Sequence, residues 1–469
     1  MAPLLPRPGQ QDKALNRIAL NTTAADDSTQ RLEQLAHTAQ RMLERARAHG
    51  ADQAEVSCNE DSGLEVNVRL GEVETVQSNR DRGLAITVYL GQRRGTASTA
   101  DLQEASIEAT VAQAVAIARY TEDDPAAGLA DPSRMATAFP DLDTWHPAAP
   151  DADAAIELAL ACEQAGRDSD ARITNSDGAG VSSNTSLSVY ANSHGFVGAE
   201  RSASHSISCA LIAGQGDGMQ RNGWYSAALS FADLWDAAEV GRKAAERTVS
   251  RLAPRSVATA QMPVLFATES ARSLIAHLVS AVSGGALYRR SSFLLDSVGQ
   301  SIFPDWFAIE ERPLLPRGWR STAFDAEGVA TRDSMLIEGG VLQRYVLGSY
   351  SARMLGLEST GNAGGVHNLS VRANAGGLDE LLAEMGNGLL VTELMGQGVN
   401  AVTGDYSRGA AGFWVENGKI AWPVDGITIA GNLRQMYANI VAVGNDVDVR
   451  SSVECGSILV HGMTVAGND

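Results

Sequence analysis

The period of the apolar residues changes along the first half of the chain, and this change limits the possible folds more than any other feature. Over 28–49, apolar residues recur every three or four positions, which places them on one face of a helix that stops at Gly50. Over 64–90, apolar residues alternate with polar ones and glycines separate the runs. This alternation predicts an antiparallel meander with one face in water, followed by a helix over 102–120.

The same order of elements recurs further along. An alanine-rich helix is predicted over 152–166, strand-like runs follow up to about residue 212, and a second helix is predicted over 234–249. Helix–meander–helix units are therefore expected at 28–120 and 151–255. The segment 121–150, which is rich in proline, is expected to be a linker on the surface. Residues 1–27 are predicted to be a mobile tail.

The pattern of residues differs over 260–469, where glycines separate short apolar runs every few residues. Two helices are predicted, over 270–283 and 378–385, and Asn417-Gly418 is a strong signal for a hairpin turn. Short strands with turns at this spacing indicate a β-rich domain, either barrel-like or a sandwich. The whole chain is thus predicted to be α+β.

Composition excludes several classes of protein. The chain has 469 residues, of which 44% are apolar, so it can bury a core. Lys and Arg total 37 against 56 Asp and Glu, and a net charge of −19 disfavours nucleic acid as a partner. The four cysteines are far apart, which favours a reduced, cytoplasmic setting. No apolar run is long enough for a signal peptide or a membrane span.

Familiar catalytic motifs are missing from the sequence. There is no G-x-S-x-G elbow, no phosphate-binding G-x-x-x-x-G-K motif and no H-E-x-x-H pair. The eight histidines are scattered, and each is more simply explained by a structural hydrogen bond. A metal site assembled from His277, His367 and Cys455 stays open.

Two clusters combine charged and aromatic residues, a combination that is unusual for a loop that only connects two strands. The first lies within 403–418 and contains Asp405, Tyr406, Arg408, Phe413 and Trp414. It is either a peptide or partner surface, with Trp414 as an anchor, or a hairpin fixed by an Asp–Arg pair. The second cluster is Tyr288, Arg289 and Arg290, at the end of the helix predicted over 270–283.

Several long motifs resemble the TldD/PmbA peptidase family, in its PmbA/TldE branch. They are S-G-G-A-L-Y-R-R-S-S-F-L-L-D-S at 283–297, G-S-Y-S-A-R-M-L-G-L-E-S-T-G-N-A-G-G-V-H-N at 348–368 and V-T-E-L-M-G-Q-G-V-N-A-V-T-G-D-Y-S-R-G-A-A-G-F-W-V-E-N-G at 391–418. The resemblance is strongest over 260–469 and extends more loosely through both helix–meander–helix units.

This resemblance implies a cytoplasmic bacterial protein with a partner. The catalytic branch of the family carries H-E-x-x-x-H and a later cysteine as zinc ligands. It forms a heterodimer with a TldE-type subunit, and the complex degrades unfolded peptides and matures peptide antibiotics. The resemblance therefore implies a TldD-like catalytic subunit and an unfolded peptide as partners, with a homodimer possible when the chain is alone.

The chain departs from the catalytic pattern at the metal position itself. Alignment on Arg289-Arg290 puts the two histidine ligand positions at Ala276 and Ala281 and the general-base position at His277, while Cys455 resembles the third ligand. Alanine has no donor atom for zinc. The resemblance thus implies a non-catalytic subunit without a cofactor of its own, with zinc in the partner. An independent hydrolase with an unrecognised site and a regulatory peptide- or protein-binding protein remain as alternatives.

Overall fold

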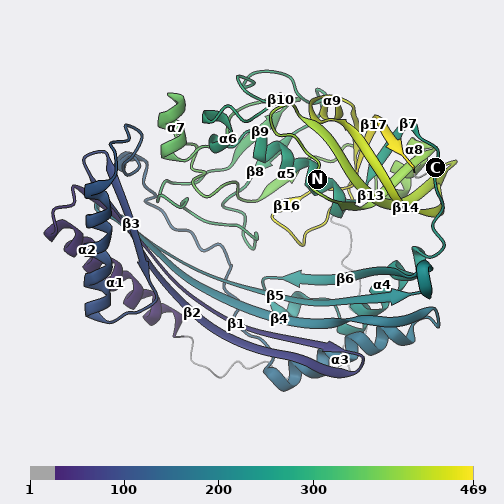
Figure 1. The fold of residues 1–469 in the computed structure, drawn as a ribbon, viewed down its shortest axis with the longest axis horizontal. Helices are drawn as coiled ribbons and strands as arrows, with labels where there is room; N and C mark the ends of the chain where they lie inside the picture. Colours follow the sequence, from purple (N-terminus) through teal and green to yellow (C-terminus); the bar gives the residue numbers. More distant parts are fainter. Residues whose placement is uncertain (1–26, 468–469) are drawn as a thin grey trace.

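A long, curved antiparallel sheet forms one side of the molecule, and the C-terminal half lies across its inner face (Figure 1). The computed structural model describes residues 27–467, so all but the last residue of the predicted tail lies outside the described residues. The sheet has the order β3-β2-β1-β4-β5-β6. Its strands are β1 (Gln53–Arg69), β2 (Glu72–Leu90), β3 (Arg93–Thr99), β4 (Ile173–Asn192), β5 (Val197–Ala213) and β6 (Gln220–Ala228). The two helix–meander–helix units therefore share one sheet, joined where β1 pairs with β4.

Several strands are longer than the sequence predicts, because some glycines lie inside strands rather than between them. Gly83 was expected to end a run, but β2 continues through it. Gly83 lies opposite Asn59 on β1, and a Cβ there would approach the Asn59 amide oxygen to 2.5 Å. The glycine is therefore explained by the space that the neighbouring asparagine needs.

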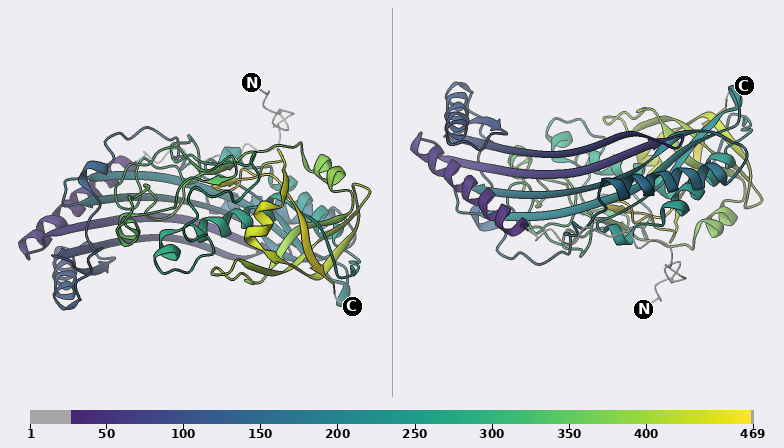
Figure 2. Two further views of the ribbon diagram at one scale, coloured as in Figure 1. Left: turned by 90° about the horizontal axis from the view of Figure 1, so that it is seen from above. Right: turned by 90° about the horizontal axis from the view of Figure 1, so that it is seen from below.

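Four helices cover the outer face of the sheet, as the views from above and below show (Figure 2). They are α1 (Ser28–Ala48), α2 (Glu104–Tyr120), α3 (Ala152–Asp168) and α4 (Ala237–Ser250). The predicted helices are confirmed, although α4 begins later than expected because Asp236 caps its first turn. One buried cluster packs α1 and α2 on the sheet, and a second packs α3 and α4. Within the described part of the chain, no helix is long and apolar enough to cross a membrane.

The inner face of the same sheet is polar. Small and polar side chains alternate there with the apolar residues that face the helices, and many of the inner ones are at least partly exposed. Examples are Ser57, Asn59, Asp61, Ser182, Asn184, Ser186, Ser202, Ser204 and Ser206. The meander with one wet face is thus confirmed, and its wet face is the one turned toward the C-terminal half.

The C-terminal half contains a closed barrel and a smaller sheet. Strands β14-β13-β12-β7-β17 follow one another, and pairing of β14 with β17 closes the ring, with β15 beside β17. These strands are β7 (Ala260–Phe266), β12 (Gly388–Met395), β13 (Asp405–Glu416), β14 (Lys419–Asn432), β15 (Ile440–Val443) and β17 (Ile458–Ala466). The barrel-like prediction is confirmed. So is the hairpin at Asn417-Gly418, where both residues have positive φ.

The smaller sheet and several short helices fill the space around the barrel. The sheet order is β10-β9-β8-β11-β16. Its strands are β8 (Ile309–Glu311), β9 (Ser334–Glu338), β10 (Val341–Leu342), β11 (Leu369–Val371) and β16 (Val453–Glu454). The α-helices of this half are α5 (Thr268–Ala281), α6 (Gly284–Tyr288), α7 (Ser349–Leu355), α8 (Leu378–Met385) and α9 (Leu433–Ala438). Short 3₁₀ turns elsewhere are η1 (Pro132–Arg134), η2 (Gly216–Gly218) and η3 (Phe231–Asp233).

The segment 121–150, called the strap below, is exposed or half-buried at most positions and buried at a few. Ala126, Leu129 and Ala130 are buried. Arg353 on α7 donates hydrogen bonds to three strap carbonyls, and the amide of Leu129 donates to the Gln53 side chain on β1. The strap is partly buried because it crosses between the sheet and the C-terminal half and contacts both.

Candidate functional site

The residues at the expected metal position lie on α5. Ala276 is exposed and Ala281 is buried, so the two side chains do not share a common environment. The segment was expected to be an ordinary buried helix, but Ala276 and Ser280 face solvent, and that prediction is wrong for this side of α5. Neither alanine can bind a metal.

His277 is half-buried between α5 and β13. Its ring packs edge-on against Tyr406 with 6.0 Å between ring centroids, and its Nε2 is buried without a hydrogen-bond partner among the described residues. Burial, assisted by the positive charge of Arg408, lowers the pKa of His277, so the imidazole is neutral at pH 7. His277 of α5 therefore meets Tyr406 and Arg408 of β13, which are distant from it in the sequence.

Tyr406 does not lie on a surface. It is 1% exposed, and burial raises the pKa of its hydroxyl to about 12. Its place in the predicted peptide or partner surface is therefore wrong: successive residues of a strand point to opposite sides, and Tyr406 points into the barrel while its neighbour Asp405 is exposed.

The other two residues of the possible assembled metal site have structural partners. The Cys455 thiol is fully buried, donates to the carbonyl of Gly456 over 3.1 Å, and has a pKa raised by burial. His367 Nδ1 lies 2.9 Å from a carboxylate oxygen of Glu311. Across residues 27–467, no three His, Cys, Asp or Glu side chains gather in a way that could hold a metal ion. The donor set does not fit zinc, and the assembled-site alternative is contradicted.

The remaining surface candidates occupy separate places. Tyr288 packs edge-on against Tyr350 at 5.8 Å, and Arg289 stacks over the Tyr288 ring at 5.1 Å. Arg289 and Arg290 are exposed. These residues lie beside α7, at one end of the inner face.

On the barrel, Asp405 does not form the predicted ion pair with Arg408. Asp405 instead accepts hydrogen bonds from Thr403 and Asn432. Trp414 is half-buried and stacks on Trp422 with 6.1 Å between centroids, while half-buried Phe413 packs against a different apolar cluster. The hairpin is thus held by its turn and its aromatic stacking.

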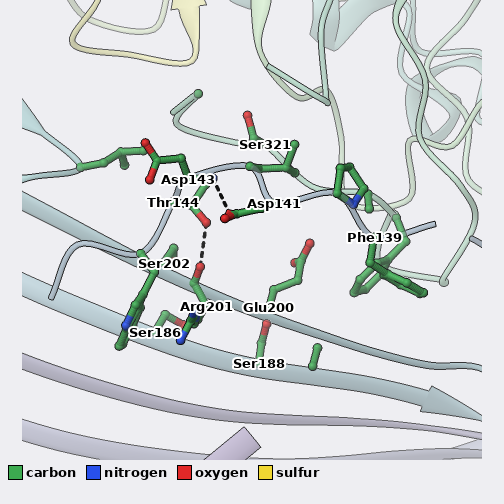
Figure 3. Close-up of a pocket in the computed structure, with 18 of the residues that line it drawn as sticks. Phe139, Asp141, Asp143, Thr144, Ser186, Ser188, Glu200, Arg201, Ser202 and Ser321 are labelled. Carbon is green, nitrogen blue, oxygen red and sulfur yellow. Dashed lines mark hydrogen bonds between the residues drawn. The ribbon is translucent and has the colours of Figure 1, made fainter. Parts of the chain in front are cut away.

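A cavity of about 310 Å³ opens on the inner face of the sheet (Figure 3). Its floor is formed by polar side chains of β4 and β5, one wall by strap residues 139–145, and the other by 318–324. The Thr144 hydroxyl donates to the carbonyl of Arg201, which holds the strap against the sheet. Phe139 and Phe324 form an aromatic wall with 6.0 Å between their centroids.

Glu200 is the most unusual ionisable group in this cavity. Burial raises the pKa of its carboxyl, although a hydrogen bond from Thr322 opposes the rise. Ser186, Ser188 and Ser202 line the same cavity. The cavity offers hydrogen bonds together with an apolar wall, a lining that is typical of a binding site.

Sequence reasoning missed this cavity because its walls come from three segments that are distant along the chain. Only one signal pointed to it: the run of serines at alternate positions in β4 and β5, which marks one strand face as polar. Nothing in the sequence shows what lies opposite that face.

A six-stranded sheet with four helices on its outer face and a closed barrel opposite its inner face define the architecture of this class of proteins. The chain belongs to the PmbA/TldD metallopeptidase family. Three family models match it in order: PmbA/TldA metallopeptidase domain 1 at 54–118, the central domain at 145–252 and the C-terminal domain at 259–467.

Relatives and solved structures agree with this assignment. The chain is 50% identical to Metalloprotease PmbA of Escherichia coli O157:H7 over 89% of this chain and 93% of that protein. It is 48% identical to the Metalloprotease PmbA homolog of Haemophilus influenzae, over 88% and 92%. A Bacteroides thetaiotaomicron structure described as a candidate modulator of DNA gyrase superposes with a TM-score of 0.88 at 29% identity, covering 92% and 98%. TldE from Thermococcus kodakarensis shares the fold, with a TM-score of 0.81 at 20% identity over 92% and 100%.

Proposed function

We propose that this chain is the non-catalytic, TldE-type subunit of a heterodimeric zinc metalloprotease, and that it shapes the channel through which a TldD-like subunit receives unfolded peptides. The observation that carries the proposal is α5, where Ala276 and Ala281 occupy the ligand positions. Zinc catalysis needs three protein ligands and an open fourth position, which this helix does not supply.

The inner face supports a role in binding peptide. It is polar, at least partly exposed and flanked by cavities of about 310 and 230 Å³, which suit single side chains of an extended chain. Main-chain hydrogen bonds tolerate many sequences, so we expect weak sequence preference and strong preference for unfolded substrates, including the precursors of peptide antibiotics.

The experiment compares the chain alone with the chain mixed with a TldD-like subunit that has an intact H-E-x-x-x-H motif. Zinc is measured by mass spectrometry and cleavage is followed on an unfolded peptide. Alone, the chain should hold well under one zinc and cleave nothing, since it lacks the three protein ligands. The mixture should cleave, and activity should be lost when the partner's histidines are replaced.

His277→Ala provides the matched control in this chain. It removes the one imidazole on α5 and should leave the zinc content and the rate of the mixture unchanged. Stoichiometric zinc in the isolated chain, lost in Cys455→Ala, would overturn the proposal.

A regulatory binding protein that acts without proteolysis is the second candidate. It is favoured by the description of two structural neighbours, from Bacteroides thetaiotaomicron and Thermotoga maritima, as candidate modulators of DNA gyrase. A mixture with the TldD-like subunit that never cleaves, combined with capture of a folded partner, would favour this function.

A further inference from the structure

A second cavity, of about 230 Å³, lies at the α7 end of the inner face, where Tyr350 lines it, and is unlike the first. Its floor comes from β1, β2, β3 and β4, and its roof from the strap, from residues 326 and 327 and from Tyr350 of α7. Two carboxylates, Glu55 and Glu327, line it together with one guanidinium, Arg94, at an exposed position. Its lining therefore carries a net negative charge.

Neutral donors hold both carboxylates. Glu55 accepts one hydrogen bond per oxygen, from the Tyr89 hydroxyl at 2.9 Å and from the Tyr190 hydroxyl at 2.8 Å. Glu327 accepts from the backbone amide of Ser349 at 2.8 Å. Each carboxylate oxygen has a second lone pair, so acceptor capacity remains in the cavity after these contacts.

The two carboxylates of this cavity, Glu55 and Glu327, destabilise each other electrostatically. Burial raises the pKa of the Glu55 carboxyl; the two tyrosine hydroxyls and the charge of Arg94 oppose the rise, and the charge of Glu327 adds to it. Two like charges in a partly desolvated space repel each other, and a cation between them would remove that penalty. Such a cation would be held by charge-assisted hydrogen bonds, which are stronger than neutral ones.

Aromatic rings complete the lining. Tyr89, Tyr190 and Tyr350 all face the cavity, and an ammonium group near such rings gains attraction from their π faces. Tyr350 is itself fixed, because its hydroxyl donates to Asp124 of the strap at 2.9 Å and its ring packs against Tyr288. The volume is below that of a typical drug-sized pocket and fits one side chain or one chain terminus.

We propose that this cavity binds a primary ammonium group of the peptide, either a lysine side chain or the free amino terminus. The proposal rests on the proposed function, because it names a subsite of the same peptide-binding face. In this proposal, the carboxylates of Glu55 and Glu327 accept hydrogen bonds from the ammonium group, and the rings of Tyr89, Tyr190 and Tyr350 form the aromatic wall around it.

The test uses the full chain without any partner, so that it does not depend on proteolysis. Binding of fluorescent decapeptides is followed by anisotropy at about 0.15 M salt, where long-range attraction is screened. One peptide has an acetylated amino terminus and a single lysine, a second has a free amino terminus and no lysine, and a third has neither ammonium. The first or the second should bind at least about tenfold more tightly than the third, the order expected for a charge-assisted hydrogen bond.

Glu327→Gln and Glu55→Gln should each remove most of that difference, and Tyr350→Leu should reduce it several-fold. Glu358→Gln is the matched control: Glu358 is an exposed carboxylate paired with Arg134, and it does not line the cavity. A chain with a charge of −19 attracts any cation weakly, so an equal loss in Glu358→Gln would overturn the proposal.

Arg94→Ala should strengthen binding, because it removes the one positive charge from the lining. If Glu55→Gln does not fold, Glu327→Gln and Tyr350→Leu carry the test. Equal affinity of all three peptides for the native chain would overturn the ammonium site and leave the non-catalytic role untouched, since that role is tested separately by zinc and cleavage.

Discussion

At the scale of single residues, the ionisable group with the clearest structural task is Glu311. It is 2% exposed and accepts hydrogen bonds from the side chains of His367, Arg344 and Asn362. Burial alone would raise the pKa of its carboxyl, but the hydrogen bond from His367 and the charge of Arg344 outweigh burial and lower the pKa to about 2. His367, a possible metal ligand on sequence grounds, thus serves to fix the glycine-rich loop that precedes it.

Glu311→Gln should lower the free energy of unfolding at pH 7 by about 3–5 kcal/mol, because it leaves the half-buried Arg344 without its counter-charge. The folded-state pKa lies below the ordinary value of about 4.3, so the native carboxylate stabilises the fold above that value. This contribution is lost as the pH falls toward 2, and the variant should lack that part of the acid dependence. Urea unfolding at pH 7, 4 and 3 measures this pH dependence. Glu358→Gln, at an exposed carboxylate, is the control and should change the free energy of unfolding little.

At the scale of helices and strands, periodicity predicted the outer helices and most barrel strands, but it did not predict the smaller sheet or the short helices α6, α7 and α9 of the C-terminal half. The helices of the outer layer and the barrel strands follow from the apolar pattern and the hairpin turn. Gly83 was interpreted as the end of a strand, although it lies inside β2 and leaves space for the Asn59 side chain on β1. The sequence also could not show that the strap contacts the C-terminal half, because those contacts come from Arg353, which lies more than 200 residues away. The cavities were missed for the same reason: local patterns contain no information on which distant segments meet.

The contact between α3 and α4 provides a prediction at this scale. A Cβ on Gly241 would lie 1.9 Å from the Cys162 carbonyl oxygen, so the two helices approach each other at this glycine. Helix propensity alone predicts that Gly241→Ala stabilises the protein by about 1 kcal/mol. The clash with backbone predicts the opposite sign, a loss of about 1–3 kcal/mol. Thermal unfolding measures the sign, and Arg242→Ala, on the exposed side of α4, should show no loss.

At the scale of the whole molecule, the strap lies between the sheet and the C-terminal half and contacts both. It crosses the polar side of the sheet, lines both cavities and is tied to the C-terminal half. Neither the sheet nor the barrel alone would have these cavities. The shape of the inner face therefore depends on contacts between segments more than on any one element.

Arg353→Ala tests this dependence. The guanidinium donates to the carbonyls of Ala126 and Gly128, each at 2.9 Å, and also to that of Leu129. Its loss should release the strap near the second cavity while the bond from the Leu129 amide to Gln53 remains, at a cost of about 1–3 kcal/mol. Limited proteolysis should then cut within 121–150 several-fold faster, and lysine peptides should bind several-fold more weakly. Exposed Arg332→Ala should behave like the native chain. Equal cutting rates in the two variants would mean that the Arg353 contacts do not hold the strap, and the two cavities would then owe their shape to the sheet and the C-terminal half alone.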